Sequence, residues 1–402
     1  MTEAVIVSAV RTPIGRANKG AFVDCRPDDL AGLAIREALA RVPALDPLEV
    51  EDVLLGCAQP AGEQGYNLAR VSAILAGMPL VPGATVNRYC SSSLQAIRMA
   101  AHAIRAGEGD VFVAAGVECV SRFSRGKSDG MPETHNPRFA AAEARTADRS
   151  FGGAGAWAPI SGVPDIYIAM GQTAENVADL EGVSRDAQDE FAVRSQQRAS
   201  KAIADGAFER EIVGVTLADG AVVTRDDCPR PDTTVEGLAN LKPAFRPDGT
   251  VTAGNACPLN DGSAAVVVMS DARAAELGIT PRARIVSSAV GGVDPEIMGL
   301  GPIEASKAAL KRAGLTIDDI DLVEINEAFA AQVIPSAAHL GVDHEKLNVR
   351  GGAIALGHPF GQTGARIMTT LLHALEDTGG RYGLETMCVG GGQGMAMIIE
   401  RF

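Results

Sequence analysis

The sequence predicts an α/β protein in which a layered half made of strands and helices occurs twice. Short apolar runs alternate with longer segments whose apolar residues recur every three or four positions, as in buried strands alternating with amphipathic helices. The order of these elements near the N-terminus recurs near the C-terminus. At 402 residues the chain is also too long for one typical core, so two or three domains are expected.

The first half alternates strands with helices, and Gly77 and Gly107 are predicted to end two of the helices. The strands are expected at residues 5–10, 53–57, 84–86, 110–116 and 261–269, and the helices at 28–41, 65–76 and from about Cys90 to Gly107.

Cys90 stands where the strand at 84–86 passes into a helix. Apolar residues then follow at steps of three, four and three, the spacing of one buried helix face: Leu94, Ile97, Ala101 and Ile104. Unpaired backbone N–H groups at a helix start favour negative charge, which lowers the pKa of a thiol. A lone cysteine is more often a small buried apolar residue, so a nucleophilic role for Cys90 depends on partners elsewhere in the chain.

The C-terminal part repeats these elements at a nearly constant offset of roughly 270 residues. The matches are 284–287 with 5–8, 305–314 with the first helix, 321–326 with 52–57, His358 with Cys90, and 387–390 with 113–116. Packing of two such halves brings equivalent strand ends together. Cys57, Cys90 and Gly116 are then expected to face three residues of the second half, Asn326, His358 and Cys388.

Three divisions of the chain follow from this pattern. We expect an N-terminal half at residues 1–118 plus 250–272, an inserted loop domain at 119–249, and a C-terminal half at 273–402. Within the loop domain, 121–164 has poor periodicity and is interpreted as a surface excursion, whereas 170–206 is predicted to be helical. Long insertions on a rigid scaffold commonly carry binding functions.

Composition excludes several classes of partner. A net charge of −14 argues against nucleic acid and anionic membrane surfaces as partners, and no apolar run is long enough to span a bilayer. The seven cysteines include no CxxC pair, so neither a disulfide framework nor a thiolate zinc site is predicted, and no metal is expected. A reducing compartment, the absence of an apolar leader and a C-terminus that is no peroxisomal address favour a cytoplasmic protein.

Three further stretches are candidates for chemistry. Asn326 follows a strand, His358 lies in a glycine-rich turn, and Cys388 precedes a run of glycines. Each has a structural alternative: Asn326 as a helix N-cap, His358 as a residue that satisfies its own loop, and Cys388 as core. The glycine run also lacks the spacing and lysine of a phosphate-binding loop. Together the three favour function, because the repeat independently places them beside Cys90.

The chain resembles the thiolase family in four ordered motifs from about residue 5 to 400. They are NRYCSS at 87–92, NEAF at 326–329, GHP at 357–359 and CVGGG at 388–392, with GNA at 254–256 and NDG at 260–262 as further matches. This resemblance implies the thiolase fold, a duplicated five-layer α-β-α-β-α architecture of two five-stranded halves. It also implies that the loop domain binds coenzyme A and that the protein is a homodimer or homotetramer.

The resemblance further implies an activity, the cleavage of 3-ketoacyl-CoA with CoA to acetyl-CoA and a shortened acyl-CoA by a ping-pong route. Cys90 is then the nucleophile that carries the acyl group, His358 its base, and Cys388 the second acid and base. Asn326 stabilises the enolate through a water, and the backbone N–H groups of Cys90 and Gly390 hold the oxyanion. Coenzyme A acts as a substrate, and no tightly bound cofactor is implied.

The resemblance to the thiolase family also implies contacts with the substrate. Arg230 matches a coenzyme A contact, while Met170, Ala328 and Phe329 match positions that line the pantetheine channel and acyl pocket. Phe360 is expected to reshape the acyl pocket. Two positions depart from the family pattern, with Ala169 in place of a common His and Cys257 in place of a common Ser, which affects the contacts to pantetheine.

Three other functions are alternatives to this activity. A biosynthetic thiolase that forms acetoacetyl-CoA uses the same motifs, although the departures mildly favour a degradative enzyme. A decarboxylating ketoacyl synthase calls for a second histidine at Asn326 and has no use for Cys388. A non-catalytic acyl-CoA or lipid carrier on the same scaffold would not need Cys90, His358 and Cys388 intact.

Overall fold

The structure is a computed structural model that describes residues 2–153 and 155–402. Ten strands join in one mixed sheet with the order β10-β11-β12-β9-β1-β8-β5-β3-β4, and β2 pairs with β8 beside this path. The first half contributes β1 (Ala4–Arg11), β2 (Gly15–Arg16), β3 (Asp52–Gly56), β4 (Gly83–Val86), β5 (Val111–Cys119) and β8 (Asn260–Ser270). The second contributes β9 (Ala283–Gly292), β10 (Leu322–Ile325), β11 (Tyr382–Val389) and β12 (Gln393–Arg401).

The two halves have the same strand pairing when each is followed outward from the β1–β9 junction, where Val5 pairs with Arg284. On one side β8 pairs antiparallel with β1 and β5 pairs antiparallel with β8, and then β3 pairs parallel with β5 and β4 pairs parallel with β3. On the other side β12 pairs antiparallel with β9 and β11 pairs antiparallel with β12, and then β10 pairs parallel with β11. The fifth place of the second half is only a parallel bridge between Val323 and Leu347. The predicted duplication is therefore confirmed, with one strand reduced to a bridge.

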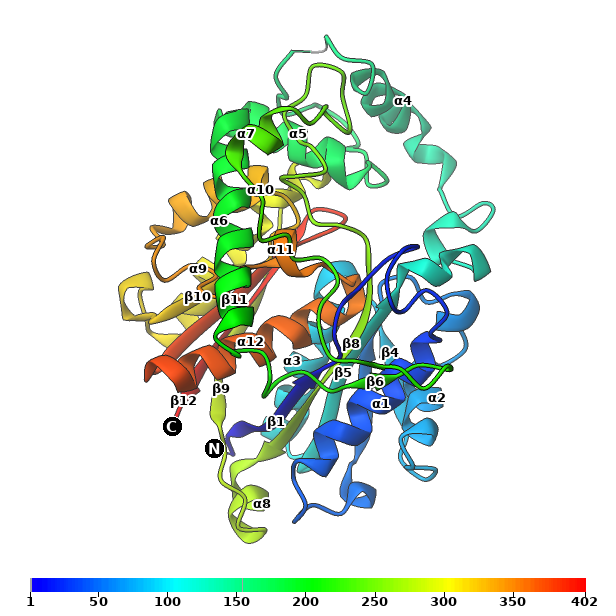
Figure 1. Cartoon of the computed structure of the whole chain (residues 1–402), viewed down its shortest axis with the longest axis vertical. Coiled ribbons are helices and arrows are strands. Elements are labelled where there is room, and N and C mark those ends of the chain that lie inside the picture. Colours follow the sequence, from blue (N-terminus) through cyan, green and yellow to red (C-terminus); the bar gives the residue numbers. More distant parts are fainter. Residues whose placement is uncertain (1, 154) are drawn as a thin grey trace.

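Helices form three layers on the faces of the two halves of this sheet. An outer core packs β1, β3, β5 and β8 against α1 (Pro27–Ala40) and α2 (Leu68–Leu75). A central core joins both halves through α3 (Ser92–Ala106) and α12 (Thr363–Thr378). A third core packs the second half against α9 (Gly301–Ala313) and α10 (Ala330–Leu340). Figure 1 shows the blue and cyan first half beside the orange and red second half.

Two close contacts between glycines and backbone fix how the halves meet. A Cβ atom on Gly364 of α12 would lie 2.4 Å from the backbone nitrogen of Leu94 on α3. A Cβ atom on Gly116 of β5 would lie 2.1 Å from the carbonyl oxygen of Gly361. Because real side chains do not approach so closely, these positions require glycine. The start of α3 is thereby held against the loop that carries His358.

The segment between β5 and β8 contains more helix than its sequence pattern predicts. It contains α4 (Ala140–Arg149), α5 (Met170–Glu181), α6 (Arg185–Ala204), α7 (Val235–Ala239) and a small sheet of β6 (Val215–Thr216) and β7 (Val222–Val223). The prediction of an irregular excursion at 121–164 is wrong for α4, a short helix with only two buried residues and hence little periodicity. The predicted helical stretch 170–206 is two helices, separated where Gly182 adopts a left-handed φ of 65°. The domain boundaries themselves stay a prediction.

Smaller differences have local causes. The predicted helix at 65–76 begins only at Leu68, because Asn67 caps it by accepting a hydrogen bond from Arg70 N at 3.3 Å. Gly107 ends α3 with a left-handed φ of 77°, as predicted. The elements α8 (Asp271–Glu276) and α11 (Ala353–Leu356) complete the helices. In the described parts of the chain, no helix combines the length and apolarity needed to cross a bilayer.

Candidate active site

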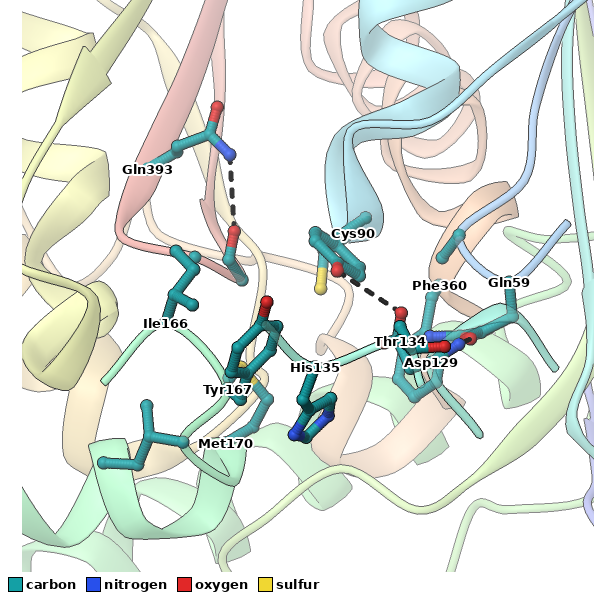
Figure 2. Close-up of a pocket in the computed structure, with 15 residues that line it drawn as sticks. Gln59, Cys90, Asp129, Thr134, His135, Ile166, Tyr167, Met170, Phe360 and Gln393 are labelled. Carbon is teal, nitrogen blue, oxygen red and sulfur yellow. Dashed lines mark hydrogen bonds between the residues drawn. The ribbon is translucent and has the colours of Figure 1, made fainter. Parts of the chain in front are cut away.

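Cys90 lies in a one-turn 3-10 helix, Tyr89–Ser91, directly before α3. Tyr89 adopts a left-handed φ of 43°, an uncommon conformation for a residue with a side chain. The backbone N–H of Arg88 donates to the Ser92 hydroxyl at 2.9 Å and helps to fix this turn. The Cys90 sulfur points into a cavity of about 330 Å³ (Figure 2).

The cavity draws its walls from both halves and from the inserted segment. Its lining residues are Ala58, Gln59, Tyr89, Cys90, Asp129, Thr134, His135, Ile166, Tyr167, Ile168, Met170, Phe360, Gly390, Gly391 and Gln393. Met170 and Phe360 thus line the same cavity as Cys90 and Gly390, and the substrate contacts predicted for them stay predictions.

The pKa of Cys90 moves in the direction opposite to the one predicted from its place before a helix. Shielding from bulk water raises the pKa of the thiol to about 12. The backbone N–H groups of Gly390 and of Cys90 itself act in the opposite sense and lower the pKa, but by less than the burial raises it. Cys90 is therefore a neutral thiol in the free protein, and the N–H groups that face it are positioned to hold negative charge when it forms.

His358 is buried and held as one tautomer by its neighbours. Its Nδ1 lies 2.6 Å from the Thr363 hydroxyl, which donates its own proton to the carbonyl oxygen of Pro359 at 2.7 Å. Since that hydroxyl is then an acceptor, Nδ1 carries the proton and Nε2 has the free lone pair. Burial, with a smaller contribution from the nearby Arg366, lowers the pKa of His358 to about 3. The imidazole is therefore neutral, with Nε2 available as a base.

Asn326 is not the helix N-cap that the structural alternative required, because α10 begins at Ala330 with Phe329 at the cap position. Its side-chain Nδ2 lies 3.3 Å from Nε2 of His358. The Asn326 Oδ1 atom is buried and has no partner in the described parts of the chain. Asn326 therefore contacts the reactive nitrogen of His358 and keeps a polar atom free for a ligand.

Cys388 ends β11 and is fully buried. Burial raises the pKa of its thiol well above the usual value, and negative charge on Cys90 or Cys257 would raise it further. It packs in an apolar cluster with Met170, Ala328 and Phe329. Cys388 is therefore close enough to Cys90 for the charge of one sulfur to act on the other, and its role as an acid and base stays a prediction.

The other predicted contacts lie outside the cavity lining. The Cys257 backbone N–H donates to the carbonyl oxygen of Ala328 at 3.0 Å, and Ala328 and Phe329 are buried behind the site. Arg230 lines a separate, smaller cavity that also includes Ala256. A role for Arg230 in binding coenzyme A stays a prediction.

Glu118, which the sequence analysis did not single out, is a buried carboxyl group at the meeting point of the two halves. It accepts hydrogen bonds from the backbone N–H groups of Ala58, at 2.8 Å, and Gly361, at 3.0 Å. Burial raises the pKa of Glu118 to about 7. A carboxylate within an apolar strand is a signal that sequence reasoning could have used, because such a group needs buried donors.

We expect alkylation of Cys90 by iodoacetamide to accelerate by about tenfold for each pH unit up to about pH 9, because only the thiolate reacts and the thiol pKa is raised. A preformed thiolate–imidazolium pair would instead give a constant rate around neutrality. Mass spectrometry of the labelled peptide measures the rate, and a plateau between about pH 6 and 8 would contradict the neutral pair.

Comparisons with known proteins identify the family. The family models described as thiolase, N-terminal domain, and thiolase, C-terminal domain, match residues 4–272 and 279–401. A Pseudoalteromonas translucida protein named 3-ketoacyl-CoA thiolase is 48% identical over 410 residues, covering 100% of this chain and 99% of that protein. An Escherichia coli K12 protein named 3-oxoadipyl-CoA/3-oxo-5,6-dehydrosuberyl-CoA thiolase is 48% identical over 413 residues, covering 100% of both.

A solved structure gives the same result. The crystal structure of the Bacillus anthracis acetyl-CoA acetyltransferase superposes with a TM-score of 0.86 at 42% identity, covering 100% of this chain and 99% of that chain. In the described residues, no group of three or more His, Cys, Asp or Glu side chains is arranged to hold a metal ion. The chain belongs to the thiolase family.

Proposed function

We propose that the protein is a 3-ketoacyl-CoA thiolase that uses CoA to release acetyl-CoA and a shortened acyl-CoA. The observation that supports this proposal is that the second half of the chain surrounds Cys90 with the predicted groups. Phe360 and Gly390 line the same cavity as Cys90, His358 packs against Phe360 with ring centroids 5.2 Å apart and contacts Asn326, and negative charge on Cys90 acts on the Cys388 thiol. Full-length relatives with the name 3-ketoacyl-CoA thiolase support it. Acyl-CoA and CoA are then the small-molecule partners, and CoA is consumed as a substrate.

In the first half-reaction the Cys90 sulfur attacks the 3-keto carbon while Nε2 of His358 takes its proton. The transfer has to accompany the attack, because the free thiol and the free imidazole are both neutral. The N–H groups of Cys90 and Gly390 face the sulfur and would hold the oxyanion that forms. Collapse of this adduct breaks the bond between C2 and C3, leaving acyl-Cys90 and the enolate of acetyl-CoA.

The enolate oxygen is then stabilised by His358 and by a water held on Asn326, and Cys388 gives its proton to the enolate carbon. In the second half-reaction Cys388 takes the proton of incoming CoA, whose sulfur attacks the acyl group on Cys90. The bond between the acyl carbon and the Cys90 sulfur then breaks, and His358 returns its proton to the leaving sulfur. Thiols suit both roles because their ordinary pKa lies close enough to neutrality for proton transfer in either direction. Ping-pong kinetics follow from the covalent intermediate.

The function is tested by incubating the protein with CoA and 3-ketoacyl-CoAs of graded chain length. We expect acetyl-CoA and a chain-shortened acyl-CoA as products, together with an acyl adduct on Cys90 in the intact mass. A protein that makes neither product nor adduct from any chain length is no thiolase. Cleavage confined to acetoacetyl-CoA would favour the acetoacetyl-forming enzyme instead, an activity close to that of the acetyl-CoA acetyltransferase relative.

For Asn326→Ala we expect a barrier higher by about 2–4 kcal/mol, the scale of one lost oxyanion donor, because Asn326 acts through water and through His358. The measurement is kcat for thiolysis, with the exposed Asn240→Ala as the matched control. An unchanged kcat in Asn326→Ala would remove this residue from the mechanism.

We also propose a cytoplasmic homodimer or homotetramer. All seven cysteines are free, which fits a reducing compartment. Helix α2 and the loop that joins it to the edge strand β4 present exposed apolar side chains, Ile74 on the helix and Leu80, which is 82% exposed, in the loop. Unpaired strand edges beside apolar surface favour association between copies. The mass of the protein in solution, measured by sedimentation equilibrium, tests this.

A further inference from the structure

The charge of the cavity separates two substrate classes that sequence identity does not. The relatives named for 3-ketoacyl-CoA and for 3-oxoadipyl-CoA are both 48% identical to this chain. A 3-oxoadipyl group ends in a carboxylate, whereas an ordinary 3-ketoacyl group ends in a methyl. We propose that Asp129 makes this enzyme select uncharged acyl groups and reject those with a terminal carboxylate. This inference rests on the proposed thiolase activity.

Asp129 is held in place at the cavity wall by a buried neighbour. Nε2 of Gln59, a residue only 7% exposed, donates to Asp129 Oδ2 at 2.5 Å. Oε1 of the same amide accepts the backbone N–H of Asp129 at 2.9 Å. The Tyr89 hydroxyl donates to the other carboxylate oxygen at 3.4 Å. The carboxylate is therefore fixed to both the loop after β3 and the residue before the nucleophile.

No cation in the cavity offsets this charge. None of the described residues that line the cavity is Lys or Arg. The hydrogen-bond partners of the Asp129 carboxylate are the neutral side chains of Gln59 and Tyr89. The imidazole of His135 is occupied by Glu143, with Nδ1 and Oε2 2.8 Å apart, and stacks on Tyr167 with ring centroids 4.0 Å apart. The guanidinium of Arg88, which is not among the lining residues, donates to the side-chain oxygen of Gln393 at 2.6 Å.

The position of Asp129 relative to Cys90 assigns it to the acyl side. Figure 2 shows Cys90 between two sides of the cavity, with Ile166 and Met170 on one and Asp129 and Phe360 on the other. Phe360 is expected to shape the acyl pocket, so the acyl chain extends toward Phe360 and Asp129. Asp129 is exposed, so a terminal carboxylate there would lie beside a like charge that water only partly screens, which lowers affinity and transition-state stability together.

The test compares two six-carbon substrates, 3-oxohexanoyl-CoA and 3-oxoadipyl-CoA, in the wild-type enzyme and in Asp129→Asn. We expect the wild type to have the higher kcat/KM for 3-oxohexanoyl-CoA. Asp129→Asn should improve the relative kcat/KM for 3-oxoadipyl-CoA by about fivefold, because a like charge in exposed surroundings is removed. The value for 3-oxohexanoyl-CoA should change much less. Asp318→Asn, which removes an exposed carboxylate elsewhere, should leave the ratio unchanged.

A wild type that prefers 3-oxoadipyl-CoA, or a ratio that Asp129→Asn leaves unchanged, overturns the inference while the thiolase proposal stands. If neither substrate yields acetyl-CoA, both the inference about Asp129 and the proposed thiolase activity are wrong. Where the variant does not fold, the wild type alone decides. Raising the ionic strength should then narrow the preference for the neutral substrate, because salt screens the repulsion, and a salt-independent ratio counts against Asp129.

Discussion

Cys90→Ala is expected to abolish thiolysis and to leave no acyl adduct on the protein. The residue supplies the sulfur to which the acyl group is transferred, and it is the one cysteine among the described residues that line the cavity. Loss of a nucleophile that works as a unit with its base typically costs about 10⁴-fold or more in kcat. The measurements are the rate of acetyl-CoA formation and the intact mass after incubation with a 3-ketoacyl-CoA.

Cys25→Ala is the matched control, because Cys25 is another free and partly exposed thiol and packs at the edge of the outer core. It should retain both activity and the adduct. An acyl group that still appears on Cys90→Ala, on any residue, would show that a different nucleophile carries the reaction. The thermal unfolding midpoint of each variant separates lost chemistry from lost structure.

The candidate catalytic residues could be selected from the sequence because each stands at the end of a strand or in a glycine-rich turn. Asn326 follows β10, Cys388 ends β11, and His358 follows Gly357. Strand ends and glycine-rich turns are determined by the local sequence, so a single stretch is enough to predict them. The duplicated order of elements then predicted which of these ends would meet, and the paired strand orders of the two halves agree with it.

The cavity walls could not be predicted in the same way. Asp129 and His135 lie before α4 and Tyr167 lies after it, in segments whose sequence has no periodicity. The positions of these residues depend on contacts outside their own segments, such as that of Asp129 with Gln59. The pKa of Cys90 shows a related limit. The backbone donors predicted from the local sequence do lower it, but burial by the second half and the inserted segment raises it more.

Cys388→Ala is expected to separate the two roles that the site assigns to its two sulfurs. The variant keeps Cys90 and His358, so an acyl group can still reach Cys90. It lacks the thiol that protonates the enolate and activates CoA, and loss of such an acid and base typically lowers the rate by about 10²–10⁴-fold. Steady-state turnover should therefore nearly stop while acyl-Cys90 still accumulates on long incubation.

Deuterium exchange makes this separation specific. In D₂O the wild type should exchange the methyl protons of acetyl-CoA, because Cys388 removes and returns a proton at that carbon. In Cys388→Ala the exchange should be lost while acetylation of Cys90 persists. Cys119→Ala, which removes a buried thiol from the outer core, controls for the small cavity that the substitution leaves. Exchange at the wild-type rate in Cys388→Ala would assign the proton transfer to another group. Since Asn326 holds no proton that it can transfer at neutral pH, that group would have to be His358, and one imidazole would then serve both half-reactions.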